Sequence, residues 1–151
     1  MRKVVISDTS CLIILEKIGE LNLLHKLYEN VITTPQIAEE FGTELPFWIE
    51  IKEVSDKQKI KILETNLDKG EASAIALALE YENSLLILDD QKARKLATQL
   101  ELTYTGTLGI IIAAKKKQII PSIKPFIEKI KQTNFHISTE LELQALKESG
   151  E

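Results

Sequence analysis

Two apolar runs, each ending in aspartate, constrain the fold of this chain most strongly. Residues 4–6 lead through Ser7 to Asp8, and residues 84–88 lead to Asp89 and Asp90. A short run without polar alternation is typical of a strand buried on both faces, as in a parallel sheet. A helical pattern follows each run. The aspartates therefore mark carboxyl ends of strands, where open parallel sheets bind their ligands.

The rest of the chain alternates between strand and helix patterns. Further strands are expected at residues 31–33, at the edge around 48–54 and at 102–104, with helices at 10–17, 20–29, 35–41, 71–82, 91–99, 108–115, 121–132 and 138–148. Another helix is expected to open with the capping-box spacing of residues 55–58. With no repeat or linker visible, this pattern predicts one α/β domain over residues 1–151, with a mainly parallel sheet and right-handed crossovers.

Composition excludes some classes of function. The formal charge of −4, with only two arginines (Arg2 and Arg94), argues against binding nucleic acid by bulk charge alone. It is compatible with metal ions that neutralise acidic groups. The single cysteine, Cys11, excludes an intrachain disulfide. We see no signal peptide and no apolar run of membrane-spanning length, so we expect a cytoplasmic protein.

Acidic residues recur where strands end and helices begin. They are Asp8, the pair Glu39–Glu40, Glu71 and the pair Asp89–Asp90. In a doubly wound sheet these positions share one edge, so the carboxylates can converge there. A hard divalent cation such as Mg²⁺ is the usual partner of such a group. Two such ions can activate water and stabilise the leaving oxygen of a phosphodiester.

Each acid also has a local interpretation. Asp8 and Asp90 stand where helix N-caps are expected. Asp68 and Glu71 fit a capping box, and Glu39 and Glu40 fit an exposed helix face. Spacing alone leaves these interpretations open beside the metal site.

Five segments resemble PIN domains, the nuclease fold of VapC-type toxins. They are residues 4–10, 34–41, 70–78, 88–94 and 105–109, so the resemblance spans nearly the whole chain in order. It implies a three-layer α/β/α sandwich and a Mg²⁺- or Mn²⁺-dependent endoribonuclease. It also implies Asp8, Glu40, Glu71 and Asp90 as catalytic and metal-binding acids, with Asp89 as a further ligand. Glu40 is chosen over Glu39 on this match alone.

The chain departs from the usual PIN pattern at two of these motifs. Leu88 stands where a hydroxyl residue commonly precedes the fourth acid, and the third acid is Glu71 instead of the commoner Asp. Ser10 is the best hydroxyl to orient a metal-bound water, unless it only caps a helix. Arg94 is placed to meet a phosphate or to pair with an acid of the cluster.

The resemblance also implies partners. An RNA substrate, a homodimer and an antitoxin protein are expected, with residues 20–29 and the Phe47–Trp48 loop as a candidate interface, although core packing is the simpler role for Trp48. The alternative function is a catalytically silent PIN-like module that binds nucleic acid or protein.

Overall fold

A computed structural model describes residues 3–151. Its strands are β1 (Val4–Ser7), β2 (Val31–Thr33), β3 (Ile49–Ile51), β4 (Ser84–Ile87) and β5 (Thr103–Thr105). Its helices are α1 (Thr9–Lys17), α2 (Asn22–Leu27), α3 (Pro35–Phe41), α4 (Lys57–Leu63), α5 (Lys69–Ala78), α6 (Gln91–Gln99), α7 (Thr107–Lys116), α8 (Lys124–Lys131) and α9 (Thr139–Glu148).

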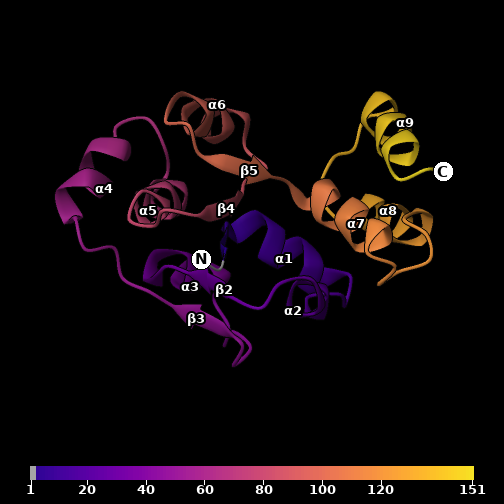
Figure 1. Ribbon diagram of the computed structural model, residues 1–151, viewed down its shortest axis with the longest axis horizontal. Coiled ribbons are helices and arrows are strands. Elements are labelled where there is room, and N and C mark those ends of the chain that lie inside the picture. The colour runs from indigo at the N-terminus through magenta and orange to yellow at the C-terminus, as the bar shows by residue number, and fades with distance from the viewer. Residues whose placement is uncertain (1–2) are drawn as a thin grey trace.

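The five strands form one parallel sheet with the order β3-β2-β1-β4-β5. Helices cover it on both sides, with α1, α2 and α7 on one side and α4 and α5 on the other (Figure 1). The predicted α/β class and parallel sheet are therefore confirmed. The reason is visible in the burial of the central strands, because every residue of β1 and β4 is buried. Only a sheet covered on both faces can bury a continuous apolar strand in this way.

The strand register places the two predicted strand ends side by side. Ser7 of β1 pairs with Ile87 of β4, and Ile87 pairs with Thr105 of β5. The Asp8 main-chain N–H continues the β1 ladder by donating to the Ile87 carbonyl at 3.0 Å. Asp8 and the residues after Ile87 therefore leave the sheet at the same edge.

Several local predictions are confirmed. Thr34 caps α3 through the Ile37 N–H, Pro35 occupies the first turn, and Gly42 ends the helix at a positive φ of 87°. Helix α6 covers residues 91–99 as expected, and Ser138 caps α9. These signals succeed because a cap depends on residues three or four positions apart.

Two predicted helix starts are wrong. The cap of α4 is Asp56, which accepts from the Lys59 N–H, because the Ser55 N–H is bound by the carboxylate of Glu80. Helix α8 begins at Lys124 and not at Pro121. The reason is long-range, since Glu151 accepts hydrogen bonds from the Ser122 hydroxyl and the Ile123 N–H and contacts Lys115 at 3.1 Å.

Other bounds shift by a few residues. The second helix spans 22–27, the alanine-rich helix spans 69–78, and the fourth strand ends at Ile87, before Leu88. Two of the lysines at the end of α7 contact other parts of the protein. Lys115 pairs with Glu151, and Lys117 lies over the Tyr28 ring. Among the described helices, none is both long enough and apolar enough to cross a bilayer.

Candidate active site

Asp8 is the most buried of the predicted acids, with 3% of its surface exposed. Its Oδ1 accepts from the Cys11 N–H at 2.9 Å, which makes it the N-cap of α1. Its Oδ2 accepts from the Asp89 N–H at 3.1 Å. The local interpretation of Asp8 as a cap is therefore correct, and the same carboxylate also joins the ends of β1 and β4.

Burial and like charge make ionised Asp8 costly. Burial first, and then the neighbouring Asp89, raises the pKa of Asp8 to about 7, with a smaller contribution from Glu71. Two main-chain N–H groups favour the ionised form, but they do not offset these effects. A buried carboxylate with a raised pKa in such surroundings is a recognised mark of a functional site.

Asp89 is held by the start of α7. Its Oδ1 accepts from the Thr107 N–H at 2.9 Å, and its Oδ2 accepts from the Thr107 hydroxyl at 2.6 Å. Gly106, the residue before α7, has no side chain that could cap it. Asp89 supplies that cap from another strand end and is fixed beside Asp8 as a result.

Thr107 is a contributor that the sequence reasoning missed. The departure at Leu88 left the fourth motif without its usual hydroxyl, and the Thr107 hydroxyl contacts Asp89, the other acid of that motif. The only available signal was the resemblance of residues 105–109, which assigns no role to this threonine.

Glu71 lies in the first turn of α5, where Asp68 caps the helix by accepting from the Glu71 N–H at 2.8 Å. Burial, and then the charges of Asp68 and Asp90, raise the pKa of Glu71 to about 7. Asp90 caps α6 through the Ala93 N–H at 2.9 Å. The capping interpretations of Asp68 and Asp90 are thus correct, and the charge of Asp90 contributes to the raised pKa of Glu71.

Glu40 reaches the same region from α3. Its Oε1 accepts from the Thr9 hydroxyl at 2.9 Å, one residue after Asp8. A Cβ at Gly70 would lie 1.9 Å from this Oε1, so only glycine leaves room for the Glu40 carboxylate there. A buried bond of 2.7 Å between Thr34 and Ser73 fixes the starts of α3 and α5 against each other. Within residues 3–151, Glu39 forms no hydrogen bond with these groups, and it lines a cavity together with Glu40 and Asp68.

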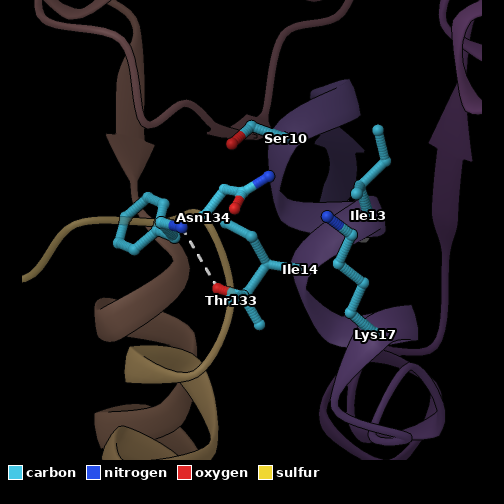
Figure 2. A pocket seen from close by; sticks show the side chains of 7 residues that line it. Ser10, Ile13, Ile14, Lys17, Thr133 and Asn134 are labelled. Carbon is cyan, nitrogen blue, oxygen red and sulfur yellow. Dashed lines mark hydrogen bonds between the residues drawn. The ribbon is translucent and has the colours of Figure 1, made fainter.

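The two supporting residues have different surroundings. Ser10 lines a cavity of about 240 Å³ between α1 and the turn that joins α8 to α9, near Asn134 (Figure 2). In the described chain, no hydrogen bond connects Ser10 with any of the predicted acids. Arg94 donates from Nε to the Leu88 carbonyl at 2.6 Å and lies over the Tyr104 ring. Of the two alternatives for Arg94, the ion pair with an acid of the cluster is not formed within residues 3–151.

The donors at this edge are all carboxylate oxygens, which suit a hard cation such as Mg²⁺ or Mn²⁺. Within residues 3–151, no three acidic, histidine or cysteine side chains form a ready-made metal cage. Mg²⁺ is commonly held by only one or two carboxylates together with water. Asp8 with Asp89 fits that mode, and the raised pKa of Asp8 is the cost that a nearby cation would relieve.

The fold is an α/β protein with a five-stranded parallel sheet, and the acids Asp8 and Asp89 lie side by side at one edge of that sheet. A family model described as a PIN domain (DUF3368) matches residues 4–151. The chain therefore belongs to this PIN-domain family, as its motifs predicted. Neither the curated proteins nor the solved structures gave a match.

Proposed function

We propose that this protein is a metal-dependent endoribonuclease that hydrolyses RNA phosphodiester bonds. The observation that carries the proposal is the buried carboxylate of Asp8, held by two main-chain N–H groups next to Asp89 at the carboxyl edge of the sheet. The nuclease-type PIN fold supports the same reaction class. Among divalent metal ions, Mg²⁺ and Mn²⁺ match a site of carboxylate oxygens best.

Asp8, Asp89 and Glu71 would hold the cation, with Glu40 and Asp90 at the margin of the site. The bound ion would supply Lewis-acid stabilisation of phosphate charge and a more acidic water. The protein contributes a fixed arrangement of charge, because Asp8 is anchored by the Cys11 and Asp89 amides and Asp89 by Thr107. Such preorganisation avoids reorganising the site during the reaction.

Two of the proposed metal ligands, Asp8 and Glu71, are partly protonated near neutral pH. The pKa values of Asp8 and Glu71 are both about 7, so each carboxyl group holds a proton for part of the time. Cation binding would displace these protons, because ligands must be deprotonated to bind a metal. Arg94 adds a positive charge beside the strand end that carries Asp89.

The biological setting belongs to the same proposal. We infer that the protein acts in the cytoplasm as the toxin of a toxin–antitoxin pair, as a homodimer whose site an antitoxin covers. Phe47 supports a contact surface, since 95% of it is exposed. Beside it, Trp48 packs against the core and stacks on His25 with ring centroids 4.9 Å apart. This agrees with the simpler, core-packing role of Trp48.

A catalytically silent PIN-like module is the second candidate. The observation that favours it is the lack of a ready-made three-group metal cage in residues 3–151. The net charge of −4 points the same way. Such a module would bind RNA or protein without cleaving RNA.

The deciding experiment is cleavage of single-stranded RNA by purified protein with Mn²⁺, Mg²⁺ or EDTA. The proposal expects cleavage with either metal, none with EDTA and none by Asp8→Asn. Asp56→Asn is the matched control, since Asp56 is also a helix cap but lies at α4. Cleavage in EDTA, or unchanged cleavage by Asp8→Asn, would contradict the mechanism, and RNA binding without any cleavage would favour the silent module.

A further inference from the structure

A cleft beside the carboxylates remains unused by the proposed reaction. Its volume is about 260 Å³, and it lies between the β5–α7 junction and α9. The lining includes Arg94, Tyr104, Leu108, Ile112, Gln144 and Glu148. Helix α9 packs against α7 (Figure 1), and residues of both helices line the cleft.

Arg94 connects this cleft with the candidate active site. A Cβ at Gly106 would lie 2.0 Å from the Arg94 Nη2 and 2.9 Å from the Asp89 Oδ1. Gly106 therefore leaves the space in which the guanidinium and the Asp89 carboxylate approach each other. The Nε of Arg94 is held by the Leu88 carbonyl, and no described acid pairs with the guanidinium. Its outer N–H groups are thus oriented and available for a phosphate.

Tyr104 gives the cleft a surface for stacking. Its ring lies 5.4 Å below the guanidinium carbon of Arg94, and its hydroxyl is 3.5 Å from the Thr98 hydroxyl. Bases of single-stranded RNA stack on aromatic rings and on guanidinium planes. The side chains of Leu108 and Ile112 add apolar walls.

The far wall of the cleft carries hydrogen-bond acceptors. On α9, the Gln144 Nε2 donates to the Glu148 Oε1 at 3.1 Å. This bond leaves the Gln144 carbonyl oxygen and the second Glu148 oxygen as acceptors. Acidic side chains accept from the exocyclic amino group of cytosine in nucleic-acid complexes. Uracil has no such amino group.

We propose that this cleft binds the nucleotide next to the scissile phosphate of single-stranded RNA. Arg94 contacts the phosphate, Tyr104 stacks on the base, and Gln144 with Glu148 accepts from an exocyclic amino group. The inference rests on the proposed ribonuclease function, and it names the substrate feature that this site selects. Bases that carry an amino group are preferred over uracil.

The test is binding of fluorescein-labelled oligo(A), oligo(C) and oligo(U) RNA to the Asp8→Asn protein, followed by fluorescence anisotropy. Using this variant separates binding from cleavage, so failure of the cleavage assay leaves the result interpretable. We expect tighter binding of oligo(A) and oligo(C) than of oligo(U). Tyr104→Ala should weaken binding by about tenfold, and Tyr104→Phe should retain it.

Ile62→Ala is the matched control, because it removes an exposed apolar side chain from α4, on the other side of the sheet from α7. The double change Gln144→Ala/Glu148→Ala, on the exposed surface of α9, should abolish the preference over oligo(U) while α9 remains folded by circular dichroism. Equal affinity for all three RNAs, or no effect of Tyr104→Ala in a folded protein, overturns the proposal. A Tyr104→Ala effect on sedimentation but not on RNA binding also overturns it, since the cleft would then be a protein contact.

Discussion

The main-chain N–H of Asp89 donates to the Asp8 Oδ2 at 3.1 Å, across 81 positions of sequence. This bond joins the ends of two neighbouring parallel strands and fixes two acids beside each other. The site therefore depends on the pairing of β1 with β4, and conditions that change the charge of Asp8 act on the fold as well as on the chemistry.

Without divalent cations, we expect the protein to become less stable as pH rises from about 4 to about 7. The pKa values of Asp8 and Glu71 are about 7 in the folded protein, whereas their ordinary values are 3.8 and 4.5. Between these limits the folded state binds more protons than the unfolded chain, so rising pH favours unfolding. For Asp8 the loss is at most about 4 kcal/mol. Urea unfolding in EDTA at several pH values measures it.

Asp8→Asn removes one of these titrations and should flatten the fall in unfolding free energy. Asp56→Asn, which changes another helix cap, should leave the slope unchanged. A slope in Asp8→Asn equal to that of the wild type would show that Asp8 does not titrate in this range.

Mn²⁺ should stabilise the wild-type protein at pH 7.5 and much less at pH 5, where the ligands hold protons. At a Mn²⁺ concentration of about one hundred times the dissociation constant, the unfolding free energy should rise by about 2.7 kcal/mol. This corresponds to an increase of roughly 5–10 °C in the melting temperature. Differential scanning calorimetry checks this shift. Asp8→Asn should lose it, and a shift of equal size in that variant would place the metal elsewhere.

Gly70→Ala should impair the site without unfolding the protein. The added Cβ would meet the flexible end of Glu40, which can move aside, and alanine is the better helix former by about 1 kcal/mol. We expect an unchanged or raised melting temperature together with loss of the contact between Glu40 and Thr9, and weaker Mn²⁺ binding by calorimetry. The control is Gly109→Ala, whose Cβ would meet the Thr105 hydroxyl at 2.0 Å instead. If Gly70→Ala and Gly109→Ala bind Mn²⁺ with equal affinity, Glu40 does not belong to the metal site.

Thr107→Val should loosen Asp89, because valine keeps the main-chain N–H but loses the hydroxyl bond of 2.6 Å. A hydrogen bond to a charged group contributes about 1.5–3 kcal/mol, so unfolding free energy should fall by an amount of that order. Thr107→Ser restores the hydroxyl and should recover most of the loss. Equal stability of the two variants would mean that the hydroxyl does not hold Asp89.

Local signals predicted much of the fold. The cap at Thr34, the stop at Gly42 and the limits of α6 each depend on neighbours along the chain, and the structure agrees with them. The apolar strands also predicted the parallel sheet, since their burial requires cover on both faces. The starts of α4 and α8 were mispredicted because Glu80 and Glu151, distant in sequence, bind the main chain there.

In the candidate site, too, features set by neighbouring residues were predictable, and features set by long-range packing were not. Asp8 and Asp89 were predictable as strand ends. The partnership of Asp89 with Thr107 was not, because it requires the pairing of β4 with β5. The space that Gly70 leaves for Glu40 likewise follows only from the packing of α3 on α5.

Both groups that hold Asp8 belong to the main chain, and this shapes how its sequence can drift. An amide N–H is present in every amino acid except proline. Position 11, now a buried cysteine, can therefore change to another small residue without releasing the Asp8 carboxylate. In sequences that descend from this one, the hydrogen bond from the N–H of position 11 to Asp8 can persist while the residue at position 11 changes. Proline is the one substitution that would remove this bond, because it has no N–H.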